Sequence, residues 1–486
     1  MGSFRLGRRQ FLGLTAAAGA AVAVAPLVVA TDARAETGVD YAGLRKALKG
    51  ALLLPGDAGY ATAATPYNAA LGVRRPAAIA NVAGAGDVGT CVRRVRGHGV
   101  TIAARSGGHS YAGFSTPDNG LVVDVSALKS ITVKSDGTAT VGAGARLIDV
   151  YAALAAHGRA LPAGSCPTVG IAGSTLGGGI GVVARAYGLT CDHLEGATVV
   201  TAGGDVHAVD GNHDADLFWA LRGGGGGNGG IVTDFTFATV PAPTVTIFSL
   251  HFPASRTARV LRAWSAWMDA APNQLSALCA ITAAATPTNR VTGTWTGPAS
   301  ALSGHLASLI AAVGASPTSR TTHTHGYLDA MKYFAGCLSE TVAGCKSKGR
   351  ESFRAASRML EHTVTASTAD QVVELMRSRR GMVLLFDSLR GQVAAPKIGD
   401  TAFAHRAAHA SVQVYSGDAA NGPAVLAVQQ ALAPIVGSGA YVNYLNPGQR
   451  DWATAYYGAN LPRLRKVIRK YDPDGVFTFA QSVLRA

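Results

Sequence analysis

Three clusters of glycine lie between residues 107 and 230, and they constrain the fold of this chain more than any other feature. They are Gly107-Gly108, GSTLGGGIG at residues 173–181 and GGGGGNGG at residues 223–230. Glycine lets backbone N–H groups approach a phosphate closely and adopts positive φ without strain. One cluster alone, such as GGGGGNGG, is equally compatible with a flexible linker. Three clusters in one segment indicate that a long, anionic cofactor passes through the fold.

The common nucleotide-binding motifs do not explain these glycines. GAGARL at residues 142–147 reproduces only part of the G-x-G-x-x-G pattern of Rossmann folds, because its sixth position is Leu147. No Asp or Glu follows in the strand context that the pattern needs, and a Walker loop is absent. The clusters therefore favour a different cofactor fold.

Around the glycines, strand and helix patterns alternate, which predicts an α+β protein of two domains. Residues 36–241 form the first domain, with strands in TIAARS, GLVVDVS, ITVKSDGTATVGAG and ATVVTAGGDVHAVD and helices in VGTCVRRVRGHGV and LIDVYAALAAHG. Residues 242–435 form the second, with strands such as MVLLFDSL and ASVQVYSG. Residues 436–486 are a separate, aromatic-rich C-terminal segment.

The N-terminus has the layout of an export signal over residues 1–35. Arg8-Arg9 precede Phe11-Leu12, a soft apolar stretch and Ala33-Arg34-Ala35, the pattern of a cleavable twin-arginine signal. That route exports folded proteins, which suits a protein loaded with a cofactor before export. An uncleaved membrane anchor is the alternative, because the apolar stretch is nearly long enough to span a bilayer. We expect a secreted protein without a stable membrane anchor.

The distribution of charge, cysteine and histidine argues against nucleic-acid binding and a metal site and predicts one disulfide. The net charge of +14 is spread along the chain, and RLRKVIRK at residues 463–470 has the spacing of a solvated helix face, so nucleic-acid binding is not expected. Of six cysteines only Cys337 and Cys345 are close in sequence, which predicts a disulfide. Two thiols on a packed loop are the alternative. The histidine pairs His405/His409 and His323/His325 lack further ligands, so no metal site is expected.

Several motifs, in order, resemble the berberine-bridge-enzyme-like branch of the covalent FAD oxidases. They are RSGGHSYAGFS, PAGSCPTVGIAGSTLGGGIGVVARAYGLTCDHL, FWALRGGGGGNGGIVTDFTF, YVNYLNP and YDPDGVFTFAQS, spread from about Val73 to Val483. The resemblance implies a covalent-flavoprotein fold with a PCMH-type FAD-binding domain at 36–241 and a substrate-binding domain at 242–435. It also implies that residues 436–486 return to the FAD domain.

The resemblance implies bicovalent FAD. His109 matches the histidine that bonds the flavin 8α carbon, and Cys166 matches the cysteine that bonds C6. Arg105, Ser106, Ser110 and the backbone of 170–173 would hold the pyrophosphate and ribitol. Val169 matches a gatekeeper position where a small residue accompanies access of oxygen. The candidate cofactor-binding residues are Arg105, Ser106, Gly107, Gly108, His109, Ser110, Cys166, Val169, Gly170, Gly173, Gly179, Gly181, Ile231 and Asn446.

The resemblance also implies a tyrosine base in YVNYLN. Tyr444 matches the residue that takes the substrate hydroxyl proton, and Tyr441 is a second candidate. If this segment is a strand, Tyr444 and Asn446 share one side. The ordinary tyrosine pKa near 10 requires a helper, so we expect a nearby cation or hydrogen bond to lower it. The candidate cations are Lys397, Arg390 and Arg406.

Two positions depart from the family pattern: Asn446 replaces a frequent aspartate, and Gly229 replaces a usual phenylalanine. The resemblance places Tyr111, Gln413 and Tyr415 at the substrate cleft. Asn446 leaves the hydrogen bonding around the tyrosine base different from that of the family.

The resulting hypothesis is a secreted oxidase that converts a substrate CH–OH to a carbonyl or lactone. Hydride passes to the flavin, and oxygen is reduced to hydrogen peroxide. An oligosaccharide is the first expected substrate. The alternatives are a secondary-metabolite oxidase, a flavin dehydrogenase that uses another acceptor, and a carbohydrate-binding protein with a vestigial flavin site. The twin-arginine machinery and oxygen are the expected partners.

Overall fold

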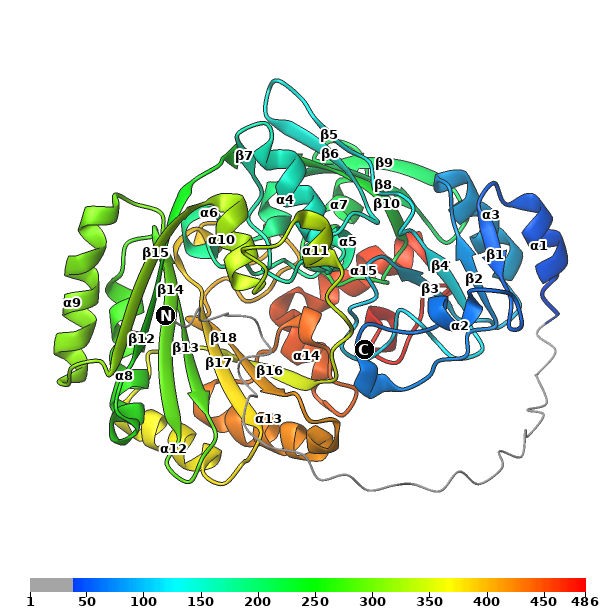
Figure 1. The fold of residues 1–486 in the computed structure, drawn as a ribbon. Coiled ribbons are helices and arrows are strands. Elements are labelled where there is room, and N and C mark those ends of the chain that lie inside the picture. Colours follow the sequence, from blue (N-terminus) through cyan, green and yellow to red (C-terminus); the bar gives the residue numbers. More distant parts are fainter. Residues whose placement is uncertain (1–37) are drawn as a thin grey trace.

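The computed structural model describes residues 38–486, and its first domain is built on two sheets (Figure 1). The first sheet has the order β1-β2-β4-β3 and the second the order β5-β6-β10-β8-β9. The strands of the first are β1 (Ala51–Leu53), β2 (Ala78–Asn81), β3 (Ile102–Arg105) and β4 (Leu121–Asp124). Those of the second are β5 (Ile131–Val133), β6 (Thr138–Gly142), β8 (Leu194–Val200), β9 (Val206–Asp210) and β10 (Ile231–Ala238). The predicted export signal lies outside the described residues.

The strand predictions of this domain are confirmed, and their sequences explain the layers. β4 is buried along its whole length and pairs in parallel with β2 and β3, as a continuous apolar run predicts. β8 and β9 form the predicted antiparallel hairpin. The helices are α1 (Tyr41–Ala47), α2 (Tyr60–Ala63), α3 (Ala85–Val95), α4 (Leu147–Ala155), α5 (Ile171–Leu176), α6 (Ala184–Tyr187) and α7 (Ala215–Leu221). A short sheet of β7 (Arg159–Ala160) and β11 (Val240–Pro241) leads to the second domain.

The second domain is a seven-stranded antiparallel sheet in the order β15-β12-β14-β13-β17-β18-β16. Its strands are β12 (Thr244–His251), β13 (Leu275–Thr282), β14 (Thr288–Trp295), β15 (Ser319–Gly326), β16 (Arg354–Leu360), β17 (Met382–Ser388) and β18 (Ala410–Ser416). One face packs against α8 (Thr257–Ala270), α9 (Leu302–Val313), α12 (Ala366–Met376) and α13 (Gly422–Val436) around an apolar core. The opposite face of the sheet is not covered by these four helices, and its strands β13, β14, β17 and β18 border a cavity.

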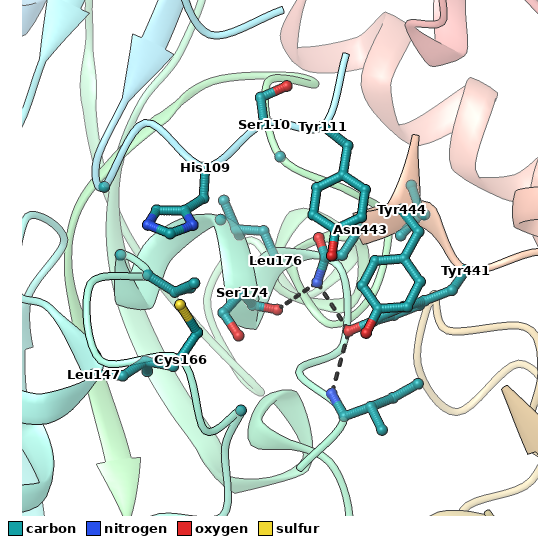
Figure 2. A pocket seen from close by; sticks show the side chains of 18 of the residues that line it. His109, Ser110, Tyr111, Leu147, Cys166, Ser174, Leu176, Tyr441, Asn443 and Tyr444 are labelled. Carbon is teal, nitrogen blue, oxygen red and sulfur yellow. Dashed lines mark hydrogen bonds between the residues drawn. The ribbon is translucent and has the colours of Figure 1, made fainter. Parts of the chain in front are cut away.

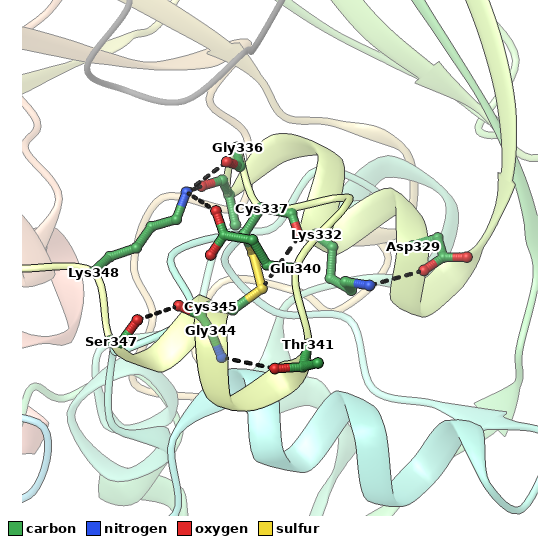
Figure 3. Close-up of a disulfide and its surroundings, with 11 residues drawn as sticks. Asp329, Lys332, Gly336, Cys337, Glu340, Thr341, Gly344, Cys345, Ser347 and Lys348 are labelled. Carbon is green, nitrogen blue, oxygen red and sulfur yellow. Dashed lines mark hydrogen bonds and ion pairs between the residues drawn. A yellow bond between two sulfur atoms is a disulfide. The ribbon is translucent and has the colours of Figure 1, made fainter.

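A strap at residues 327–348 leaves this sheet and packs on the first domain. It carries α10 (Tyr327–Phe334) and α11 (Val342–Lys346), which both contact α4. Cys337 and Cys345 are joined by a disulfide at its turn (Figure 3). The Tyr327 hydroxyl donates to the Leu161 carbonyl at 2.9 Å, and Lys346 pairs with Asp149 at 2.7 Å. The strap thus packs with the first domain, although its sequence lies within 242–435.

The C-terminal segment also packs on the first domain. It contains α14 (Trp452–Tyr457) and α15 (Leu461–Tyr471), and α15 contacts α7. Leu464, Val467 and Ile468 of α15 join the core of the first domain, and its basic residues occupy the outer side. The RLRKVIRK run is therefore an amphipathic helix with a solvated face.

Arg185 of α6 ties the first domain to the second. The residue is 2% exposed, and its guanidinium donates to the carbonyls of Ala271, Leu275 and Leu389 at 2.9, 2.7 and 2.6 Å. Burial lowers the pKa of Arg185 to about 10, which still leaves it charged at neutral pH. One buried side chain therefore satisfies three backbone acceptors of the other domain.

We expect Arg185→Met to lower the free energy of unfolding by about 3 kcal/mol, because three buried carbonyls lose their donor. The midpoint of urea unfolding followed by circular dichroism measures the change. Arg469→Met is the matched control, since Arg469 lies on the exposed side of α15. Equal midpoints for the two variants would contradict this account of the domain contact.

Candidate active site

A cavity of about 440 Å³ lies between the glycine-rich loops of the first domain and the free face of the second-domain sheet. One wall comes from residues 106–110 and from parts of segments 164–173 and 226–232, and it includes glycines of all three clusters. The other wall comes from β13, β14, β17 and β18, and residues 441–445 close one end. The three clusters of glycine, far apart in sequence, thus border one space.

The glycines allow two loops to touch through their backbones. A Cβ on Gly107 would lie 2.3 Å from the Gly170 nitrogen, and a Cβ on Gly170 would lie 2.1 Å from Ser106 Oγ. Gly108 adopts φ +69°, which L residues with side chains rarely adopt. At Gly173 a Cβ would meet nothing within 4 Å, so its backbone borders open space. These walls fit a large cofactor that approaches the main chain closely.

His109 and Cys166 lie on the same side of this cavity (Figure 2). His109 Nε2 is 3.0 Å from Thr168 Oγ1, and Cys166 Sγ is 3.9 Å from the same oxygen. These two distances add to 6.9 Å, which is therefore the largest possible separation of the two atoms. The 8-methyl group and C6 of a flavin share one edge of its ring system. The residues present therefore fit a flavin held at that edge by both side chains.

Three tyrosines occupy the opposite side (Figure 2). The rings of Tyr111 and Tyr444 stack with centroids 5.0 Å apart and planes 12° from parallel. Tyr441 meets Tyr444 edge-on at 4.9 Å. Gln413 Nε2 donates to the Tyr111 hydroxyl at 2.9 Å. Tyr444 is thereby fixed in orientation through its ring, within the same cavity as His109 and Cys166.

Tyr441 is not suited to act as a base. Its buried hydroxyl oxygen accepts hydrogen bonds from the Gly179 and Ile180 backbone N–H groups at 2.9 and 3.2 Å and from Asn443 Nδ2 at 2.9 Å. Burial nevertheless raises the pKa of Tyr441 to about 12, against the lowering effect of these bonds. Tyr441 therefore anchors the loop of Gly179, and Tyr444 is the better candidate for proton transfer.

The sheet wall contributes two charged residues that the sequence analysis missed. Asp387 pairs in register with Leu278, and Leu278 with Thr292, so the three share the face that lines the cavity. Among the described lining residues, Asp387 is the one carboxylate and Arg290 the one arginine or lysine. Burial lowers the pKa of Arg290 to about 10. The sequence offered one sign of a role for Asp387, which is the only charged residue in the apolar strand MVLLFDSL.

YVNYLN does not form a strand, so the strand-based reason for placing Tyr444 and Asn446 on one side does not apply. Val442–Tyr444 is a single turn of 3-10 helix, in which the Tyr444 N–H donates to the Tyr441 carbonyl at 2.9 Å. Asn446 begins the next turn, where its side chain accepts from the Gly448 N–H at 2.9 Å, and it does not line the cavity. The Asn-Pro sequence favours turns over an extended strand here.

Other predicted site residues also lie away from the cavity. Arg105 is buried in an ion pair with Asp124, whose Oδ2 is 2.9 Å from Nε and 2.6 Å from one terminal nitrogen. Gly179 gives its N–H to Tyr441, and Tyr415 stacks on Phe353 with centroids 5.7 Å apart. Arg105, Gly179 and Tyr415 are absent from the cavity wall.

The expected cations lie elsewhere too. Arg406 pairs with Asp192 at 2.6 Å, Arg390 contacts His409 at 2.7 Å, and Lys397 is exposed. Of the cations within the described chain, only Arg290 reaches the cavity wall.

The remaining predicted residues border the cavity. They are Ser106, Gly107, Gly108, His109, Ser110, Tyr111, Cys166, Val169, Gly170, Gly173, Gly181, Ile231, Gln413, Tyr441 and Tyr444. Across residues 38–486, no group of three or more His, Cys, Asp or Glu side chains is arranged to hold a metal ion. In the same range, no helix combines the length and the apolar character that a membrane span needs.

Two known protein families match this chain, one in the first domain and one in the C-terminal segment. A family described as "FAD binding domain" matches residues 76–210, and one described as "Berberine and berberine like" matches residues 440–484. The FAD-linked oxidoreductase YgaK of Bacillus subtilis (strain 168) is 33% identical over 90% of this chain and 97% of its own length. The chitooligosaccharide oxidase of Gibberella zeae is 31% identical over 86% of this chain and 89% of its own length.

A solved structure extends the comparison to three dimensions. The glucooligosaccharide oxidase from Acremonium strictum, described with a 6-S-cysteinyl, 8α-N1-histidyl FAD, superposes with a TM-score of 0.83 at 27% identity. The match covers 92% of this chain and 99% of that one. Fold and sequence thus agree along nearly the whole described chain.

Proposed function

This chain belongs to the berberine-bridge-like family of FAD-linked oxidoreductases, and from that premise we propose that it oxidises a hydroxyl group of an oligosaccharide. The observation that carries the proposal is the arrangement of the cavity. His109 and Cys166 line one side, while Tyr444 and Asp387 line the wall formed by the C-terminal segment and the sheet. We propose that FAD is bonded to both His109 and Cys166, as described for the glucooligosaccharide oxidase.

Bound FAD supplies the acceptor for the hydride of the substrate carbon, and oxygen then takes the two electrons to give hydrogen peroxide. The protein manages the proton. Tyr444 Oη takes the proton of the substrate hydroxyl, because its ring is fixed by Tyr111 inside the cavity. Asp387, the carboxylate of the described cavity wall, takes the phenol proton as Tyr444 accepts that of the substrate. Because the phenol proton leaves as the substrate proton arrives, the relay needs no free tyrosinate at neutral pH.

The chemistry of the sheet wall supports a carbohydrate as substrate. Ser276, Thr292, Thr294, Gln413 and Arg290 present hydroxyl, amide and guanidinium groups that can bond sugar hydroxyls. Tyr333, Phe334 and Phe353 line the same space and can pack on the apolar faces of sugar rings. Oxidation at the anomeric carbon gives a lactone, which water opens to an aldonic acid. We further propose export through the twin-arginine signal at residues 1–35.

The test is oxygen uptake and peroxide release with cello-, chito- and xylo-oligosaccharides, each beside its borohydride-reduced form. We expect turnover with at least one intact series and none with the reduced forms, which have lost the anomeric hydroxyl. The product should gain one oxygen atom by mass. Equal turnover of the reduced forms would exclude anomeric oxidation. Dye reduction without oxygen uptake would instead identify a dehydrogenase.

A further inference from the structure

We propose that Tyr67 and Thr168 are positioning residues that hold the His109 imidazole for covalent attachment of the flavin, an inference that rests on the proposed function. The two side chains contact His109 in different ways. Tyr67 stacks on the ring, and Thr168 contacts one ring nitrogen. Neither residue was singled out by its sequence motif.

The Tyr67 ring sets the plane of the imidazole. The centroids of the two rings are 3.6 Å apart and their planes differ by 21°. The Tyr67 N–H donates to the carbonyl of Gly108 at 3.2 Å, so the stacking ring is tied to the residue before His109. The next residue, Asn68, is 1% exposed and exchanges two hydrogen bonds with the Phe353 backbone, at 3.1 and 3.2 Å. The stacking residue is therefore part of a rigid segment.

The Thr168 hydroxyl sets the tautomer. Its oxygen lies 3.0 Å from His109 Nε2, and the residue is 7% exposed and absent from the cavity wall. A neutral imidazole has one N–H and one nitrogen with a lone pair. When Nε2–H donates to Thr168, the lone pair belongs to Nδ1, which becomes the bonding nitrogen. Thr168 thus acts on the ring without touching the substrate.

A hydroxyl suits this position both before and after the bond forms. Attachment makes an Nδ1–C bond at the flavin 8-methyl carbon and breaks one C–H bond there, while the imidazole loses its Nε2 proton. The two hydrogens, as two electrons and two protons, reduce one dioxygen to hydrogen peroxide. Thr168 accepts from Nε2–H before attachment and donates to the Nε2 lone pair afterwards. An apolar side chain of the same shape can do neither.

The experiment isolates the histidyl bond in a Cys166→Ala background. Full-length protein from a riboflavin auxotroph is given FAD, and acid-stable flavin fluorescence on the denatured chain is followed over time. We expect Thr168→Val to slow attachment about tenfold, the effect of one hydrogen bond at the reacting group, while Thr168→Ser keeps the parent rate. Tyr67→Leu should slow it similarly, while Tyr67→Phe keeps the ring and the rate. Acid-released FAD reports that each variant still binds the cofactor.

The outcomes separate this inference from the proposed function. If the Cys166→Ala parent itself gains no acid-stable flavin, attachment at His109 is wrong. If the parent reacts and Thr168→Val and Tyr67→Leu react at its rate, the positioning role is overturned. Slow attachment by Thr168→Ser as well would also reject the hydroxyl as the determinant. A Thr168→Val chain that binds no FAD leaves the decision to the Thr168→Ser and Tyr67 pairs.

Discussion

Tyr444→Phe should lower kcat about a thousandfold, because it removes the hydroxyl that takes the substrate proton while keeping the ring that stacks on Tyr111. KM and the acid-stable flavin should stay close to those of the parent, since neither depends on the phenol oxygen. Stopped-flow reduction of the flavin by substrate measures the step directly. The matched control is Tyr111→Phe, which loses one hydrogen bond to Gln413 and should cost about tenfold.

Asp387→Asn extends the same test to the proton acceptor. An amide of equal shape cannot take the phenol proton, so kcat should fall about a hundredfold, with the loss persisting at neutral and mildly alkaline pH. If Tyr444→Phe reduced the flavin at the parent rate, proton transfer would have to be assigned elsewhere. If only Asp387→Asn remained active, the relay would be wrong and Tyr444 would act with another partner.

The second large effect concerns the cofactor bonds. His109→Ala and Cys166→Ala should each keep one acid-stable bond, while the double variant should release essentially all flavin on denaturation. His109 and Cys166 both lie near Thr168 on one side of the cavity. Each would bond a different atom of the flavin, so we expect either bond alone to hold it. Cys91→Ala is the control: burial in α3 raises the pKa of this thiol to about 12, and Cys91 does not line the cavity. Flavin lost from either single variant would show a monovalent attachment.

The first-domain elements were predictable because their signals are local. The alternation around Gly203-Gly204 marked the β8–β9 hairpin, and the apolar run of GLVVDVS marked the buried strand β4. The strap at 327–348 was not predictable, because its apolar residues read the same whether they pack on their own sheet or on α4. Only the three-dimensional arrangement decides between these partners.

The part of the site that lies in local sequence motifs was predictable, and the part that depends on strand pairing was not. His109, Cys166 and Tyr444 stand in distinctive motifs, whereas Asp387 and Arg290 are isolated charges whose strand register brings them to the cavity wall. Arg105 was predicted to bind the pyrophosphate. In the structure, its Nε and one terminal nitrogen both donate to Asp124, its partner on the neighbouring strand. Which charged residues lie opposite one another in a sheet depends on the order and register of the strands, and a single sequence does not specify these.

The central claim is a bicovalent flavin opposite a proton-accepting tyrosine, and the mass and visible spectrum of the acid-denatured wild-type protein test it most directly. We predict that the chain keeps a yellow chromophore after acid and carries the added mass of one FAD, with the peptides of His109 and Cys166 cross-linked through it. A colourless chain, or flavin recovered entirely in the acid supernatant, would contradict the account.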